Sequence, residues 1–270
     1  MKSFTVTENC DLKSFTGAVY PQGSFCLAAL VRDKDIKVNG VRTGRNVQLK
    51  KGDEVIYYTT PKQEGMPSHY VVYEDNNVYV ADKLSGVETE GLLRELCGKG
   101  EFYAVHRLDR NTQGIIIFAK NKQAEEELLA VFRDRRCRKT YLAKCKDNFK
   151  KQSGVLTAYL QKDAEKSEVK IYDEPRKGAA EIVTEYRVIS SADGIADVEI
   201  VLHTGRTHQI RAHMAYIGCP VLGDEKYGDK AMNNKFGLKR QRLVSKSLQT
   251  DADGILGYLK GRVFQSCFTP

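Results

Sequence analysis

Apolar and polar positions alternate along the second half of the chain in the way that strands of an antiparallel sheet require. Residues 155–160 (VLTAYL) and 198–202 (VEIVL) carry this pattern, with turn-forming residues between them. Upstream, residues 70–73 (YVVY) and 78–81 (VYVA) flank four polar residues and predict a hairpin. The apolar run 115–119 (IIIFA) predicts a buried strand. Together these patterns predict a mixed, largely antiparallel sheet.

Helical periodicity appears in three segments of the same region. Residues 88–97 form the first, and Asn121 is expected to cap the second. One apolar face of that second helix is predicted to contain Ala124, Leu128, Leu129 and Phe132. Thr207 is expected to cap a third helix, which Gly218 and Pro220 end. The fold class is therefore α+β, with helices at the periphery of the sheet.

The first 62 residues have the pattern of a small separate α+β unit. Asn39-Gly40 is a strong type I′ hairpin signal between strand 36–38 and the strand that begins at Val41. A Lys-Lys-Gly-Asp turn precedes another strand, at residues 54–58.

The predicted domains are residues 1–62 and residues 70–270, with a linker at residues 63–69. The linker region contains Gly65 and Pro67, which favour turns over regular structure. Within the first domain, Pro21 is expected to shorten any helix that precedes residue 24.

Composition narrows the class of protein. The 270 residues include 43 Lys and Arg against 35 Asp and Glu, a net charge of +8, which favours an anionic partner such as nucleic acid. No apolar stretch approaches the roughly 18 residues of a membrane span, and the first residues lack the apolar region of a signal peptide. We therefore expect a cytoplasmic protein that does not bind membranes.

Neither a disulfide framework nor a metal site is expected. The seven cysteines are scattered and form no Cys-x-x-Cys pair. His203, His208 and His213 suggest a metal site, but the last two are five residues apart and would diverge on a helix. Polar contacts at the helix end explain these histidines better.

The densest basic run is residues 133–144 (RDRRCRKTYLAK), which enters a strand at Tyr141. A charged run is often only a solvated face, but arginines this close repel each other, which favours an anionic partner. A second basic patch contains Lys235, Lys239, Arg240, Arg242 and Lys246.

A polar loop at residues 104–114 (AVHRLDRNTQG) carries the first candidate for chemistry. Asp109 lies there between two arginines, and cationic neighbours keep a carboxylate ionised. The alternative is a turn aspartate that hydrogen-bonds its own backbone. A second motif, residues 202–213 (LHTGRTHQIRAH), is followed by residues 218–224 (GCPVLGD).

With HRLD at residues 106–109 and RKTY at residues 138–141, these motifs make the chain similar to the RluA-type RNA pseudouridine synthases from about residue 71 onward. The resemblance implies the pseudouridine synthase fold with a central cleft. It also implies conversion of specific uridines in RNA to pseudouridine, without a metal or organic cofactor. The N-terminal segments KDIKVNG and LKKGDEV resemble the S4-like RNA-binding module, which implies a structured RNA partner.

The resemblance also implies roles for individual residues. Asp109 corresponds to the catalytic carboxylate, Tyr141 to a tyrosine that stacks on the base, and Arg211 to the basic partner of the aspartate. Substrate-binding roles are implied for His106, Arg107, Arg138, Lys139, Arg206 and His208. RNA contacts of the S4-like module are expected from Arg32, Lys34, Lys37, Arg42 and Arg45, unless this segment is a small domain with a solvated charged face.

The chain departs from the family pattern at two places. Gln113 replaces a usual serine, and residues 243–246 (LVSK) replace a usual Leu-His-Ala. Ribosomal RNA is the expected substrate, and the protein is expected to be a monomer. Transfer RNA, a catalytically silent RNA-binding clamp and a glycosidase remain the alternatives, although a glycosidase normally needs a second carboxylate.

Overall fold

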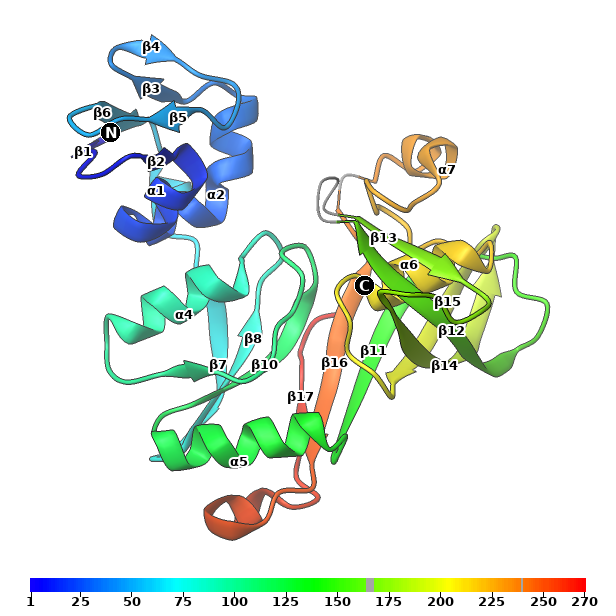
Figure 1. Cartoon of the computed structure of the whole chain (residues 1–270). Coiled ribbons are helices and arrows are strands. Elements are labelled where there is room, and N and C mark those ends of the chain that lie inside the picture. Colours follow the sequence, from blue (N-terminus) through cyan, green and yellow to red (C-terminus); the bar gives the residue numbers. More distant parts are fainter. Residues whose placement is uncertain (164–167, 239) are drawn as a thin grey trace. The chain divides into compact units, whose positions relative to one another are not determined.

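The computed structural model describes residues 1–163, 168–238 and 240–270 (Figure 1). Lys239 of the expected C-terminal basic patch lies outside these residues. Contacts divide the described chain into an N-terminal unit, residues 1–70 with 86–102, and a C-terminal unit, residues 71–85 with 103–270. No helix in the described ranges is long and apolar enough to cross a membrane.

The N-terminal unit combines helices with small sheets. Its elements are β1 (Lys2–Thr5), β2 (Cys10–Asp11), α1 (Leu12–Val19), α2 (Pro21–Arg32), β3 (Ile36–Val38), β4 (Val41–Arg42), β5 (Gln48–Leu49), β6 (Glu54–Tyr57), α3 (Pro61–Glu64) and α4 (Thr89–Cys97). The main sheet has the order β1-β6-β3-β4, and β2 pairs with β5. Leu12, Leu30 and Tyr57 are fully buried in the core between this sheet and the helices.

Two expectations for this unit meet different outcomes. The β3–β4 hairpin forms as predicted, with positive φ at both turn residues, Asn39 (49°) and Gly40 (79°). The expectation that Pro21 shortens any helix before residue 24 is confirmed for α1, which ends at Val19, but a second helix, α2, begins at that proline and continues to Arg32. A proline in the first helical turn removes only an N–H that has no partner within the helix.

The segment 86–102 groups with the N-terminal unit, whereas sequence reasoning assigned it to the catalytic domain. Its helix α4 packs on α2, and Lys13 forms an ion pair with Glu88 at 3.0 Å. The expected domain limits at residues 62 and 70 stay a prediction.

One large mixed sheet organises the C-terminal unit (Figure 1). Its elements are β7 (His69–Glu74), β8 (Val78–Lys83), β9 (Tyr103–Ala104), β10 (Gln113–Ala119), α5 (Lys122–Arg133), β11 (Cys137–Lys146), β12 (Ser153–Asp163), β13 (Glu168–Tyr172), β14 (Ala179–Ala192), β15 (Ile195–Leu202), α6 (Gln209–Tyr216), α7 (Lys230–Lys235), β16 (Leu243–Thr250), the 3-10 helix η1 (Gly254–Leu259) and β17 (Val263–Gln265). The strand order is β13-β12-β14-β15-β11-β16-β10-β8-β7, with β17 beside β16 and β9 beside β10. The β10–β16 pair is parallel, and the pairs β8–β10, β11–β16, β11–β15, β14–β15, β12–β14 and β12–β13 are antiparallel. This confirms the mixed, largely antiparallel sheet.

Two apolar cores lie on this sheet. The first packs α5 and η1 against β8 and β10, with Ile115, Ile117 and Leu128 fully buried. The second packs α6 against β12–β14 around Ile182 and Ala212. The central strands β11 and β16 run between the two, so that side chains on their ends can meet loops from both halves.

Helix α5 forms as expected, with one exception on its apolar face. The Asn121 side chain accepts a hydrogen bond from the Ala124 N–H and caps the helix. Ala124 and Leu128 are buried, but Leu129 is 44% exposed, so its expected core position is wrong. Leu129 lines a cavity instead.

Candidate active site

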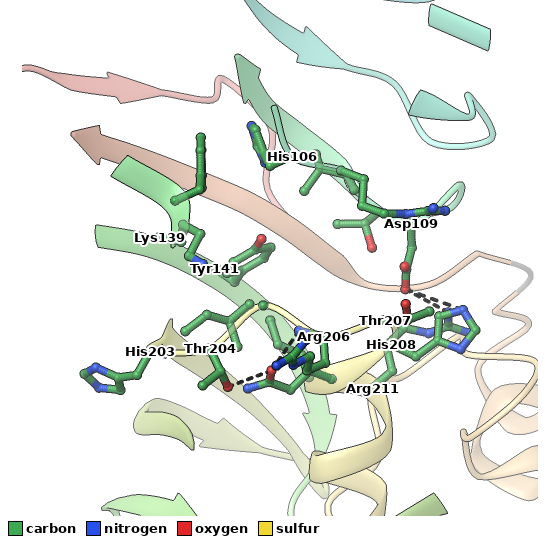
Figure 2. Close-up of a pocket in the computed structure, with 18 of the residues that line it drawn as sticks. His106, Asp109, Lys139, Tyr141, His203, Thr204, Arg206, Thr207, His208 and Arg211 are labelled. Carbon is green, nitrogen blue, oxygen red and sulfur yellow. Dashed lines mark hydrogen bonds and ion pairs between the residues drawn. The ribbon is translucent and has the colours of Figure 1, made fainter. Parts of the chain in front are cut away.

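A cavity of about 560 Å³ lies in the C-terminal unit (Figure 2). Its lining comes from residues 105–112, residues 129–141 and residues 202–211, together with Leu243. These are the loop before β10, the passage from α5 into β11, and the loop before α6. The fold therefore brings together the three sequence motifs that carry candidate chemistry.

Asp109 lies at the wall of this cavity with its carboxylate turned toward α6 (Figure 2). Arg211 Nη1 donates a hydrogen bond to Asp109 Oδ2 at 2.9 Å, and His208 Nε2 is 3.9 Å from the same oxygen. No described residue donates a hydrogen bond to Oδ1. Asp109 is therefore held through Oδ2 and leaves Oδ1 available. Its side chain is 18% exposed.

The loop that carries Asp109 is anchored at its far end by a close approach of β10 and β16. Gly114 has φ of +115°, and a Cβ there would lie 2.2 Å from the Ser245 carbonyl oxygen. Any side chain would force the two strands apart. Lys83 Nζ donates to the Arg110 carbonyl at 3.3 Å, so a buried cation supports the residue after Asp109.

His106 anchors the near end of the same loop. Its Nε2 accepts a hydrogen bond from the Ile117 N–H at 3.0 Å, and its ring stacks on Phe132 with centroids 4.5 Å apart. Burial, helped by the charge of Lys139, lowers the pKa of His106 to about 3. A neutral ring held by the backbone fits an anchoring role better than the substrate-binding role expected for it.

Helix α6 begins one residue later than expected. Thr207 was the predicted cap, but His208 occupies the cap position in a left-handed conformation, with φ of 55°. The Gln209 side chain makes this start possible, because its Oε1 accepts from Thr204 Oγ1 at 2.9 Å and from the Arg206 N–H at 3.0 Å. This arrangement points His208 and Arg211 toward Asp109 from the same side (Figure 2).

Two further side chains at this site escaped sequence reasoning. Asp224 accepts from Arg211 Nε at 2.7 Å and from Nη2 at 3.0 Å, with a fully buried carboxylate. The Tyr227 hydroxyl is 3.0 Å from His208 Nδ1, and its ring lies 5.3 Å from the Arg211 guanidinium. Burial lowers the pKa of His208, which is neutral at pH 7. The motif ending in Asp224 was visible, but nothing local connected it to Arg211.

Tyr141 closes the opposite wall of the cavity from β11 (Figure 2). Its side chain is almost completely buried. Burial raises the pKa of Tyr141 far above its usual value, and the negative charge of Asp109 raises it further, against a hydrogen bond with Ser245 that lowers it. The hydroxyl is therefore protonated at neutral pH and can donate a hydrogen bond.

The expected substrate-binding cations divide into two groups. Arg107, Lys139 and Arg206 line the cavity, whereas Arg138 does not. Successive side chains of a strand point to opposite faces, so Lys139 shares the inner face of β11 with Tyr141 and Arg138 lies on the other.

Lys139 is half-buried at the cavity wall, and its ammonium group makes no hydrogen bond or ion pair with any described residue. Burial lowers the pKa of its ammonium group. Gly205 leaves room for it, because a Cβ at that position would come within 3.3 Å of Lys139 Nζ. This cation is available to an anion that enters the cavity.

The basic run before β11 is partly neutralised by the protein itself. Arg133 pairs with Asp134 at 2.9 Å, and Arg136 pairs with Asp253 at 2.8 Å. Arg135 lines the cavity, is exposed and has no carboxylate partner among the described residues. The run therefore offers fewer free charges than its sequence suggests.

The cations of the N-terminal unit that are expected to contact RNA also include both paired and unpaired side chains. Arg32 pairs with Asp33 at 2.7 Å, and Arg42 pairs with Asp35 at 3.1 Å and donates to the Lys34 carbonyl. The ammonium of Lys37 and the guanidinium of Arg42 lie 5.4 and 5.1 Å from the ring centre of Tyr58. Arg45 has no ion-pair partner in the described chain and lines a shallow surface hollow of this unit.

The two departures from the family pattern contact the same segment. Lys246 Nζ donates to the carbonyls of Ser266 and Phe268, at 2.5 and 3.2 Å, and Gln113 Nε2 donates to the Thr269 carbonyl at 3.3 Å. These hydrogen bonds hold residues 266–269 against the start of β10, where the Asp109 loop ends. The changed residues therefore serve packing inside the unit.

The other two histidines of the expected helix-end group, His203 and His213, make separate contacts. His203 Nε2 lies 2.9 Å from Glu185 Oε2 at the cavity rim. His213 Nδ1 lies 3.0 Å from Thr184 Oγ1, and burial lowers the pKa of His213 to about 4. Neither ring contacts a set of side chains that resembles a metal site.

The chain is similar to known proteins in sequence and in fold. The family model described as RNA pseudouridylate synthase matches residues 57–216. The ribosomal large subunit pseudouridine synthase C of Rickettsia conorii is 30% identical over 74% of this chain and 76% of its own length. The protein of the same name from Vibrio cholerae is 30% identical over 82% and 78%. The solved structure of human RNA pseudouridylate synthase domain containing 1 has the same fold, with a TM-score of 0.60 at 24% identity over 75% of this chain and 83% of that one.

Proposed function

Because the chain belongs to the RNA pseudouridylate synthase family, we propose that it isomerises chosen uridines of ribosomal RNA to pseudouridine with Asp109 as the catalytic carboxylate. The observation that carries the assignment of Asp109 is its geometry: Oδ2 is held by Arg211, and Oδ1 has no partner at the wall of the cavity. The ribosomal substrate is supported by the names of the relatives from Rickettsia conorii and Vibrio cholerae.

The reaction needs few protein groups. The C1′–N1 glycosidic bond breaks, the base turns, and a new bond joins C1′ to C5, from which a proton leaves. The open oxygen of Asp109 suits each role that this scheme offers a carboxylate: attack on C1′, attack on C6, or removal of a proton. Arg211 holds the carboxylate through a hydrogen bond to Oδ2, which leaves Oδ1 to act on the nucleotide in any of these roles.

The target base must leave its stack to reach Asp109, at a cost of a few kcal/mol. Stacking on the Tyr141 ring offsets about 1–3 kcal/mol of that cost. Burial raises the pKa of Tyr141, so we assign it a stacking surface and a hydrogen-bond donor rather than a base. Arg107 lines the same cavity and is assigned to hold the RNA strand.

The proposal is tested by release of tritium from RNA labelled at uridine C5, with unmodified ribosomal RNA and transfer RNA as separate substrates. We expect release from ribosomal RNA, because the C5 proton must leave when the new bond forms. Release from transfer RNA alone would overturn the substrate, and release of free uracil would indicate a glycosidase. Tight binding of both RNAs without release would indicate a silent clamp.

Phosphate binding is assigned to the cations at the cavity that pair with no carboxylate among the described residues: Lys139, Arg135 and Arg206. Each phosphate contact releases counterions, so RNA affinity falls with salt. We expect Arg135→Ala to reduce the slope of log K against log salt concentration by about 0.7–1. Arg136→Ala is the matched control: its guanidinium is already bound to Asp253, so the slope should stay unchanged. Equal slopes in both variants would contradict the assignment.

The N-terminal unit is assigned an S4-like role in holding structured RNA outside the active site. Support comes from the cations of its charged surface, above all the exposed Arg45 and the half-buried Lys37. A ribosomal substrate would place the enzyme in the cytoplasm, and the expectation of a monomer stays a prediction.

A further inference from the structure

Asp224 is the most completely buried carboxylate near the active site, and its contacts are saturated. Oδ2 accepts from Arg211 Nε at 2.7 Å. Oδ1 accepts from Arg211 Nη2 at 3.0 Å and from the backbone N–H groups of Lys226 and Tyr227 at 2.9 and 3.1 Å. Burial by itself raises the pKa of Asp224, but these bonds and the charge of Arg211 lower it below its usual value. Asp224 is therefore ionised at neutral pH and binds the Nε and Nη2 side of Arg211.

The loop that carries Asp224 is itself held firmly. Gly223 has φ of +72°, and a Cβ there would lie 1.9 Å from the Arg240 carbonyl oxygen. The Gly223 N–H donates to Asn233 Oδ1 at 2.7 Å, and Asn233 Nδ2 donates to the Asp224 carbonyl at 3.1 Å. Asp224 therefore cannot follow Arg211 if the latter moves.

The consequence concerns how many hydrogen bonds Asp109 receives. A guanidinium is a planar fork that prefers to bind a carboxylate through two parallel bonds. Here that bidentate bond goes to Asp224, and Asp109 receives a single bond from Nη1. Without Asp224, Arg211 would be free to turn its fork toward Asp109 and occupy both oxygens.

We propose that Asp224 is a positioning residue for the isomerisation: by binding the Nε and Nη2 edge of Arg211, it limits Arg211 to one hydrogen bond with Asp109 and keeps Oδ1 available to the uridine. The inference rests on the proposed function, because it assigns Asp224 a role through Asp109. Tyr227, whose ring lies beside the Arg211 guanidinium, completes the restraint.

The test compares Asp224→Asn with Asp229→Asn in single-turnover tritium release and in RNA binding. Asparagine keeps the shape of Asp224 but removes its charge, so the rate should fall by about 10–100-fold. The Kd for RNA should remain within about twofold, since no RNA-facing cation changes. Asp229 is a matched control, because it pairs with Lys146 at 2.8 Å and caps α7 without contacting Arg211. That variant should react at the wild-type rate.

A second variant separates positioning from folding. Asp224→Glu keeps the carboxylate and should recover part of the rate that Asp224→Asn loses. Thermal unfolding measured on the same samples shows whether each variant is folded at the assay temperature. A wild-type rate in Asp224→Asn, an equal loss in Asp229→Asn, or a loss of rate that tracks unfolding would each overturn the inference. If the wild-type protein releases no tritium, the proposed function fails instead.

Discussion

Replacing Asp109 with asparagine is expected to lower the single-turnover rate of uridine isomerisation by at least about ten-thousand-fold. The substitution keeps the size of the side chain and a hydrogen-bond acceptor for Arg211 Nη1. It removes the anionic oxygen that attacks the nucleotide or takes its proton, and no other carboxylate in the described part of the chain lines the cavity to replace it. Tritium release from C5-labelled ribosomal RNA, with enzyme in excess over RNA, measures this rate directly.

The same variant should still bind RNA. Lys139, Arg135 and Arg206 are untouched by the change, so the Kd should remain within a few-fold of the wild-type value. Asp134→Asn serves as the control, because Asp134 pairs with Arg133 near the cavity but contributes nothing to its lining. That control should react at the wild-type rate. Residual activity of Asp109→Asn within about 100-fold of the wild type would assign the catalytic carboxylate elsewhere.

Sequence reasoning succeeds in this chain where a feature depends on neighbouring residues. The Asn39-Gly40 turn needs only two residues with positive φ, and both have it. Helix α5 needs a cap one residue before it starts, and Asn121 provides the side-chain oxygen. The apolar run in β10 is long enough to require burial on both faces, and Ile115–Ala119 is completely buried.

It fails where a distant contact decides the local structure. Thr207 is a good cap by type, yet the helix starts after His208, and the next residue, Gln209, is held by β14 because its Nε2 donates to the Val183 carbonyl at 3.2 Å. The preference of Thr207 for a cap position is genuine, but contacts with a strand far along the chain accompany a helix start one residue later.

The candidate site shows the same division. The sequence identified Asp109, Tyr141 and Arg211, and the structure brings all three to one cavity. The partner of Arg136 is Asp253, more than a hundred residues away, so the neutralised half of the basic run could not be distinguished from the free half. Asp224 is part of a visible motif, but its bond to Arg211 depends on how the loop between α6 and α7 packs against α6.

Two substitutions of Tyr141 are expected to separate the contribution of its ring from that of its hydroxyl. Tyr141→Leu removes the ring that stacks on the extruded base and should lower the rate of isomerisation by about 100-fold. Tyr141→Phe keeps the ring and should lose no more than about tenfold, the value of one hydrogen bond. The reason is that burial raises the pKa of Tyr141, so its hydroxyl does not lose its proton near neutral pH.

The control for removing a buried tyrosine is Tyr186→Leu, because Tyr186 is equally buried in β14 but does not line the cavity. Its rate should match the wild type at temperatures where the variant is folded. If Tyr141→Phe loses as much as Tyr141→Leu, the hydroxyl takes part in proton transfer. Binding of the RNA would then have to lower the pKa of Tyr141 by placing a positive group, such as the ammonium of Lys139 on the same face of β11, against the phenol.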